Sequence, residues 1–218
     1  VDTCVCASLL RLYDTAYAQL WGQKMTSTPQ KWTAIVLAGQ RPGVDPLAAH
    51  FFERLKALIY VGGEPMVTRV VRTLFSVPEI GRIAVLAQDR DLLGDAVAKG
   101  GPAEMAESGA GISTSILRFS ENAGDLWPLF VTTADHPLLT TDMVTYFLAH
   151  SEGCDLAIGM VERATMLTAY PGNQRTWLKF RDGHWSGTNL FALRSDKARA
   201  ALLLWAEAEQ DRKKAWKL

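Results

Sequence analysis

The sequence predicts an α/β domain built around a mostly parallel sheet, and two observations support this class. Its 218 residues are enough for one domain with a well-buried core but are short for two. Apolar runs at 34–37, 83–87 and 129–132 are each followed by a segment with helical periodicity. Such alternation is typical of parallel strands that are joined by crossover helices.

The remaining elements follow from periodicity and from turn residues. After the first strand, apolar side chains recur at helical spacing over 65–75, which predicts the first long helix. Further helices are expected at 89–100, from 109–115 towards Phe119, at 142–150 and from about 196 to the end, and strands are expected at 155–161, 176–180 and 190–193.

The two ends of the chain are expected to differ from this pattern. Residues 1–30 are interpreted as an appended helical segment, with Met25 as an alternative start, and 31–218 as the single domain. The last residues, 211–218, are basic and include Trp216. They form either a solvated helix face or the start of a missing segment that contacts a membrane surface, in which case the domain is truncated.

Composition excludes several classes of function. The 23 basic and 23 acidic side chains cancel, which argues against a broad nucleic-acid surface and makes any phosphate site local. No apolar run approaches the ~20 residues of a membrane span. The three cysteines, Cys4, Cys6 and Cys154, lack the spacing of a zinc site or a disulfide framework and fit a reducing cytoplasm.

The stretch after the first strand indicates phosphate binding. An apolar strand ends at Leu37-Ala38-Gly39, a loop with Arg41 follows, and Lys56 then lies between apolar residues. Backbone N–H groups of such a loop can face phosphate oxygens, and a lysine can add a full positive charge. The competing interpretation of the glycine is a structural turn.

A second signal follows the central strand at 129–132. Asp135 comes directly after it in the run Thr133-Ala134-Asp135-His136-Pro137. Ligands bind at this edge of an open α/β sheet, where a carboxylate can hold Mg²⁺ against phosphates. The alternative is that Asp135 starts a turn before a helix near Thr140.

Taken together, these motifs resemble the MobA-like branch of the nucleotidyltransferases. The resemblance rests on Leu37-Ala38-Gly39, Lys56-Ala57-Leu58, Gly63-Glu64-Pro65-Met66 and Thr133-Ala134-Asp135-His136-Pro137-Leu138, which occur in the order of the family over about 33–195. It implies a three-layer Rossmann-like fold, similar to that of GT-A glycosyltransferases. The implied reaction is Mg²⁺-dependent transfer of a nucleoside monophosphate from an NTP to a small phosphorylated acceptor, with release of pyrophosphate.

The resemblance also implies roles for individual residues. The first loop, with Leu37, Ala38, Gly39 and Gln40, would wrap the triphosphate, while Arg41 and Lys56 would neutralise its charge as the catalytic cations. Asp135 and, from the late Gly187-Thr188-Asn189 segment, Asn189 would bind the metal. Ser113, Thr114 and Ser115 would lie near the base or ribose. For Asn189 the alternative is a turn asparagine, and for the three hydroxyls it is a helix cap.

The chain departs from the family in its first loop. The family has a second glycine where this chain has Gln40, and the loop is lengthened over 46–53 before Lys56. The role of Arg41 depends on how this loop is aligned. Either the Gln40 side chain points out while its N–H faces phosphate, or nucleotide binding by this loop is weakened or altered.

Two alternative functions and one unassigned cluster stay open. The alternatives are a nucleotide-binding regulatory protein of the same fold without turnover, and a GT-A glycosyltransferase, which would favour an Asp-x-Asp motif. A dehydrogenase fits poorly because the Gly-x-Gly-x-x-Gly spacing is missing. Arg175, Lys179 and Arg181 could meet an anionic acceptor or simply line an exposed strand. The acceptor, the base and the oligomeric state are left open.

Overall fold

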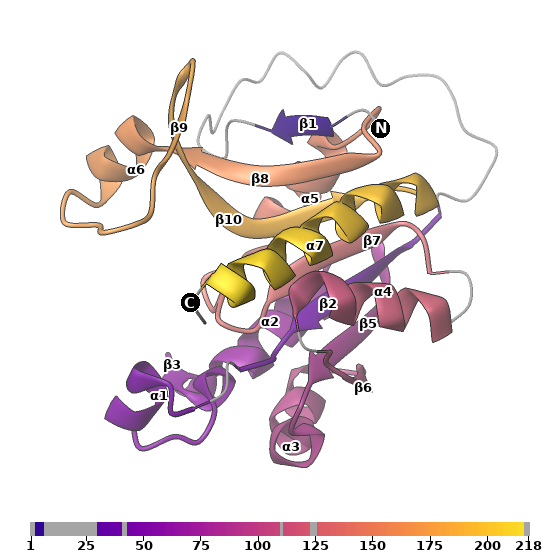
Figure 1. Ribbon diagram of the computed structural model, residues 1–218. Coiled ribbons are helices and arrows are strands. Elements are labelled where there is room, and N and C mark those ends of the chain that lie inside the picture. Colours follow the sequence, from indigo (N-terminus) through magenta and orange to yellow (C-terminus); the bar gives the residue numbers. More distant parts are fainter. Residues whose placement is uncertain (1–2, 7–29, 41–42, 110, 123–125, 216–218) are drawn as a thin grey trace.

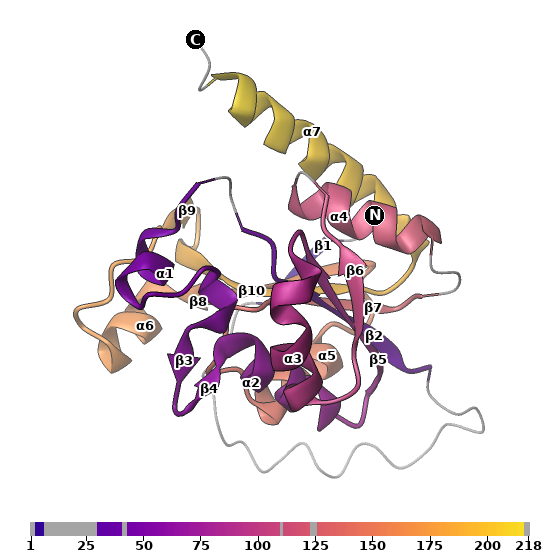
Figure 2. The ribbon, with the colours of Figure 1, turned by 90° about the horizontal axis from the view of Figure 1, so that it is seen from below.

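The structure, a computed structural model, describes residues 3–6, 30–40, 43–109, 111–122 and 126–215. One sheet lies between two layers of helices (Figure 1). Seen from below, α2 (Met66–Phe75), α3 (Arg90–Gly100) and α5 (Thr141–His150) lie on one face, and α4 (Ile112–Asn122) and α7 (Arg199–Ala215) on the other (Figure 2). The α/β class predicted from the sequence is confirmed.

The sheet has the order β1-β8-β10-β7-β2-β5-β6, and β9 pairs with β10. Its strands are β1 (Thr3–Cys6), β2 (Trp32–Leu37), β5 (Ile80–Ala87), β6 (Glu104–Glu107), β7 (Leu129–Thr133), β8 (Leu156–Glu162), β9 (Leu178–Phe180) and β10 (Gly183–Leu193). Strand β2 is parallel to β5 and β7, β5 to β6, and β1 to β8. Within the described residues only β10 runs against the others, since it is antiparallel to β7, β8 and β9, so the sheet is mostly parallel.

Short elements follow β2 and β8. They are α1 (Pro46–His50), the 3-10 helix η2 (Lys56–Leu58), the two-stranded pair β3 (Tyr60–Val61) and β4 (Glu64–Pro65), and α6 (Arg163–Ala169). A second 3-10 helix, η3 (Asp196–Ala198), precedes α7. The lengthened first loop is thus ordered at α1, where the Asp45 carboxylate caps the helix by accepting from Leu47 N and Ala48 N, both at 3.0 Å.

Each central strand contributes side chains to both faces of the sheet. In β2, Ala34 and Val36 pack with α2, α3 and α5, whereas Ile35 packs with α4 and α7. Because successive side chains of a strand point to opposite faces, a strand covered on both sides must be apolar throughout. This explains why the strands were visible in the sequence as continuous apolar runs.

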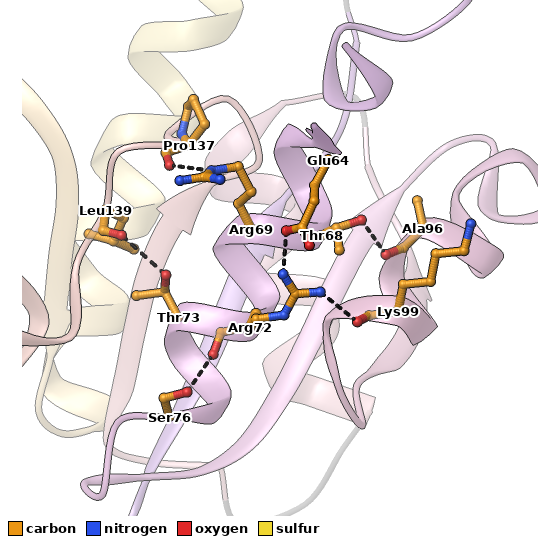
Figure 3. A network of polar contacts seen from close by, with 10 residues as sticks. All are labelled: Glu64, Thr68, Arg69, Arg72, Thr73, Ser76, Ala96, Lys99, Pro137 and Leu139. Carbon is orange, nitrogen blue, oxygen red and sulfur yellow. Dashed lines mark hydrogen bonds and ion pairs between the residues drawn. The ribbon is translucent and has the colours of Figure 1, made fainter. Parts of the chain in front are cut away.

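Side chains of helix α2 form hydrogen bonds to α3 and to the segment after β7 (Figure 3). Thr68 Oγ1 donates to Ala96 O of α3 at 2.6 Å, and Arg72 pairs with Glu64 and donates to Lys99 O. On its other side, Arg69 Nε donates to Pro137 O at 3.1 Å, and Thr73 Oγ1 donates to Leu139 O at 3.1 Å. The segment after β7 is therefore held in place by side chains of α2.

The prediction for the N-terminal segment is corrected in part. The four residues Thr3–Cys6 form strand β1 beside β8, so the helix expected over 1–30 does not include them. Residues 7–29, with Met25, lie outside the described part of the chain. The division into 1–30 and 31–218 stays a prediction.

A search of the described residues finds no helix that is both long and apolar enough to cross a membrane.

The contact between α2 and α3 yields a stability prediction. A Cβ on Gly100 would lie 2.7 Å from Thr68 O and 2.8 Å from Val71 Cβ, both of which are in the packed interior. Gly100→Ala should lower the free energy of unfolding by about 1–3 kcal/mol, because buried backbone has little room to move. Urea denaturation measures the change.

The matched control is Gly94→Ala in the same helix. A Cβ on Gly94 would meet no atom within 4 Å. This change should raise the free energy of unfolding by about 0.5–1 kcal/mol, because alanine restricts the unfolded chain more than glycine does. Equal effects of both changes would contradict the proposed close approach of the two helices.

Candidate active site

The candidate site lies where β2 and β7 end side by side. Leu37 is in register with Thr133, and the chain continues the pairing beyond both strands, because Ala134 N donates to Leu37 O at 2.9 Å. Ala38 N in turn donates to Leu86 O at 2.9 Å, which binds the loop to β5. The parallel sheet therefore presents the residues after β2 and after β7 at one edge, where open α/β sheets bind ligands.

Gly39 has little space for a side chain. A Cβ there would lie 3.0 Å from Ser108 Oγ and 3.1 Å from Gln88 Nε2. Ser108 follows β6 and stands at the start of the 109–115 loop, so the loop after β2 and the loop before α4 adjoin at Gly39. A side chain at this position would require the Ser108 and Gln88 side chains to shift, so close approach rather than a turn favours glycine here.

Gln40 points into the loop instead of out of it. Its Oε1 accepts from Lys56 N at 3.2 Å, its Nε2 lies 3.5 Å from Arg54 O, and its N–H donates to Gln88 Oε1 at 3.0 Å. The expected arrangement, with the side chain outside and the N–H on phosphate, is not the one observed. Gln40 instead connects the two ends of the lengthened loop.

Lys56 forms an ion pair with Asp135. Lys56 Nζ lies 2.5 Å from Asp135 Oδ2, across 79 positions of sequence. The side chains keep 37% and 32% of their surface exposed, so solvent reaches both partners. The geometry brings together the lysine and the acid that the sequence predicted from two separate motifs, and it places an ammonium group directly on the carboxylate.

Asp135 is also linked to Asn189 through Thr133. The Thr133 hydroxyl hydrogen-bonds to the Asp135 carboxylate and accepts from Asn189 Nδ2 at 3.3 Å. Asn189 uses its amide nitrogen in this bond, whereas the amide oxygen is the atom that binds metals. Thr133 thus orients both predicted metal ligands, a role that sequence reasoning did not assign to it.

The position of Asn189 depends on an irregularity in β10. The register between β10 and β8 shifts between Gly187 and Phe191, and Asn189 has a left-handed φ of +57°. Asparagine tolerates this conformation better than most residues. Gly159 of β8 makes room for the bulge, since a Cβ there would lie 2.4 Å from Thr188 Oγ1. Such bulges redirect side chains near active sites.

The surroundings shift the pKa of two side chains. Burial alone would raise the pKa of the Asp135 carboxyl, but hydrogen bonds from Lys56 and Thr133 and the charge of Lys56 hold it below its usual value. Burial lowers the pKa of His136, the Asp135 charge acts in the opposite direction, and the Arg175 charge lowers the pKa further. The site therefore holds an ionised carboxylate beside a neutral imidazole near neutral pH.

The hydroxyls before α4 are engaged within their own loop. Ser115 Oγ accepts from Gly109 N at 2.8 Å and donates to Gly111 O at 2.6 Å, and Thr114 Oγ1 bonds to the backbone of Gly111. Ser113 is fully buried and its hydroxyl has no partner among the described residues. Thr114 and Ser115 thus use their hydroxyls to fix the loop. The groups of the loop that remain for a ligand are those of its backbone. Their contact with a nucleotide stays a prediction.

The structure brings most predicted residues to one edge. Leu37, Ala38, Gly39, Gln40, Lys56, Asp135 and Asn189 converge there, while Arg41 lies outside the described residues. Gln88, Ser108 and Thr133 also contribute but were not predicted. Gln88 directly follows β5 and Thr133 ends β7, so the apolar runs of these two strands marked their positions, whereas Ser108 follows β6, which shows no such run.

The donor set fits a cation that also binds a ligand's oxygens. Among the described residues, no group of three or more His, Cys, Asp or Glu side chains is arranged to hold a metal ion. Mg²⁺ usually takes one or two protein carboxylates and completes its shell with water and phosphate oxygens. Asp135, already paired with a cation, and the amide oxygen of Asn189 supply donors of that chemistry.

Solved structures with known descriptions share this fold. A hypothetical transferase from Thermus thermophilus is similar, with a TM-score of 0.68, 26% identity, and coverage of 86% of this chain and 76% of that one. A 4-diphosphocytidyl-2C-methyl-D-erythritol synthase from Anaerococcus prevotii gives a TM-score of 0.59 at 13% identity, covering 82% and 76%. A CMP:2-keto-3-deoxy-manno-octonic acid synthetase complexed with CTP gives 0.57 at 16%, covering 81% and 78%. No curated protein sequence matches the chain significantly.

A comparison with protein-family models tests the family resemblance that the sequence motifs suggested. The model of the MobA-like NTP transferase domain matches residues 34–213, which includes every element of the site described above. The resemblance stated from separate motifs is confirmed. The chain belongs to the MobA-like NTP transferase family.

Proposed function

We propose that this protein transfers a nucleoside monophosphate from an NTP to a small phosphorylated acceptor and releases pyrophosphate, with Mg²⁺ as cofactor, in the cytoplasm. The observation that carries the proposal is the Lys56–Asp135 pair at 2.5 Å, next to the loop of Gly39 and Gln40. It supports the proposal because a cation suited to phosphate oxygens and a carboxylate suited to a metal lie together at the same strand edge.

Transfer of a nucleoside monophosphate requires that the two substrates are positioned and that their negative charge is neutralised. An oxygen of the acceptor phosphate forms a bond to the α-phosphorus, and the bond from that phosphorus to the bridging oxygen breaks, so that pyrophosphate leaves with the electron pair. A phosphate monoester is already largely dianionic at neutral pH, since its second pKa is about 6, so no general base is needed.

The residues of this chain divide the work between them. Lys56 would neutralise charge on the triphosphate, and Gln40 would hold Lys56 and the loop together while it does so. Thr133 would keep Asp135 and Asn189 oriented. A bound Mg²⁺ would neutralise the charge that develops on the phosphate oxygens. Lys56 must then leave the carboxylate for the phosphates, a step that the exposure of both partners permits.

A glycosyltransferase of similar fold is less well supported. An Asp-x-Asp motif that includes Asp135 would need a second acid at position 133 or 137, and these positions hold Thr133 and Pro137.

The first test is pyrophosphate release. With Mg²⁺, a panel of NTPs and phosphorylated acceptors, the wild-type protein should release pyrophosphate, and chelation by EDTA should abolish the release. Asp135→Asn and Lys56→Met should each lower kcat/KM by about 10²–10³, the usual cost of losing one electrostatic contact in a transition state. Lys99→Met, an exposed lysine on α3, is the control and should be unchanged.

Two outcomes would count against the proposal. Robust turnover by both variants would remove Lys56 and Asp135 from the mechanism. Binding of an NTP without turnover of any acceptor, seen as a rise in melting temperature, would favour a regulatory protein of the same fold.

A second prediction concerns the charge on Asp135. Lys56→Met should raise the pKa of the Asp135 carboxyl, because burial then acts without the ammonium group that opposes it. Carboxyl ¹³C NMR titration measures this pKa. The pair's contribution to stability is present above the unfolded-state pKa and is lost as the pH falls through the folded-state value.

The difference in free energy of unfolding between wild type and Lys56→Met should therefore shrink in acid. Arg72→Met breaks the ion pair with Glu64 instead and should leave the pKa of Asp135 where it is. An unchanged or lower Asp135 pKa in Lys56→Met would contradict the ion pair.

A third prediction tests the role of Gln40. Gln40→Ala removes the contacts to Lys56 N and Arg54 O but keeps the backbone bond to Gln88. The Kd for the NTP should rise about fivefold, since one hydrogen bond contributes ~1 kcal/mol. Isothermal titration calorimetry measures Kd. Nucleotide affinity equal to wild type would show that the lengthened loop closes without Gln40.

A further inference from the structure

One arginine beside the site has no carboxylate partner among the residues that the structure describes. Arg175 lies in the segment between α6 and β9. Strand β9 forms a hairpin with β10 that projects from the sheet (Figure 1). Its Nε donates to Ser186 Oγ at 3.1 Å and its Nη2 donates to Gly187 O at 2.6 Å. Both acceptors are neutral, and among the described residues no Asp or Glu lies within ion-pair distance of Arg175.

The contacts of Arg175 place its charge close to the reacting groups. Gly187 is the last residue before the bulge of β10, and Asn189 is two residues further on. Asn189 bonds to Thr133, and Thr133 bonds to Asp135. The Arg175 charge also acts on His136, which lies next to Asp135 in the chain. One chain of contacts therefore connects Arg175 to Asp135 through β10 and Thr133, whereas Lys56 contacts Asp135 directly.

The other basic residues of the hairpin differ from Arg175. Lys179 and Arg181 are exposed at the far end of the hairpin, whereas Arg175 is partly buried and its guanidinium is fixed by two hydrogen bonds to β10. A fixed cation that is partly shielded from water and has no counter-ion within the described residues favours binding of an anion. The remaining N–H groups of the guanidinium can donate to it.

We propose that Arg175 is the anchor for the phosphate monoester of the acceptor. Lys56 and the loop after β2 would then serve the triphosphate, and Arg175 would hold the second anion on the β10 side of Asp135. This inference rests on the proposed function for the identity of the anion. The carboxylate of Asp135 separates two cations of different role, so the two anionic substrates meet beside it.

The test uses inorganic phosphate as the probe. The full chain is first saturated with Mg²⁺ and an α,β-methylene NTP analogue, which occupies the triphosphate site, and phosphate is then titrated at constant ionic strength. The melting temperature of the wild type should rise further and saturate, because the ligand binds only the folded state. Arg175→Gln should weaken the apparent phosphate affinity at least tenfold. Arg181→Gln, in the same hairpin, should keep it.

The conservative variant checks for simple misfolding. Arg175→Lys keeps the charge but loses the fork that bonds Ser186 and Gly187, so an intermediate phosphate affinity is expected. The melting temperatures without ligand show whether the variants are folded. If Arg175→Gln and Arg181→Gln respond to phosphate alike, the proposal that Arg175 anchors the acceptor phosphate is wrong.

The two proposals fail in different ways. If the nucleotide analogue does not raise the melting temperature, the proposed function fails. The phosphate titration is then run on nucleotide-free protein, where a loss of phosphate binding in Arg175→Gln but not in Arg181→Gln still supports an anion site at Arg175. An equal response of both variants overturns it there as well.

Discussion

The parallel pairing of β2 with β7 is the constraint on which the site depends. Because Leu37 and Thr133 are in register, both strands end at the same edge, and the bond from Ala134 N to Leu37 O carries the pairing past the strand ends. This pairing places the loop of Gly39 and Gln40 next to Asp135. Helix α2 then holds the segment after Asp135 through Arg69 and Thr73, so the acid is fixed from two sides (Figure 3).

Against this rigid edge, the charges are arranged without a large basic surface. The chain has equal numbers of acidic and basic residues, so an anion site must come from local placement. Lys56 forms an ion pair with Asp135, whereas the partners of Arg175 in the described part of the chain are neutral atoms of β10. A paired cation can exchange its partner for a phosphate, and an unpaired one offers its charge directly. Lys56 and Arg175 are therefore not equivalent as anion-binding groups.

The parts of the fold that were visible in the sequence are those with strong periodicity. Strands covered on both faces read as apolar runs, and α2 shows a continuous apolar face. Strand β6 has the sequence EMAE, which carries no β-branched residue, and it was missed along with α1 and α6, which are short. Residues such as Thr133 and Gln88 act through tertiary contacts, and no local pattern marks such a role.

Gln40 shows how a departure from a family pattern acquires a structural explanation. From the sequence, glutamine in place of glycine and the lengthened loop both weakened the case for a functional phosphate loop. In the structure the two departures belong together, because the Gln40 side chain bonds to Arg54 and Lys56 at the far end of the inserted segment. The insertion, which includes α1, is closed at its base, and Lys56 still reaches Asp135. A glycine at position 40 has no side chain to close that loop, so the longer insertion and the glutamine are two parts of one solution to the same geometric requirement.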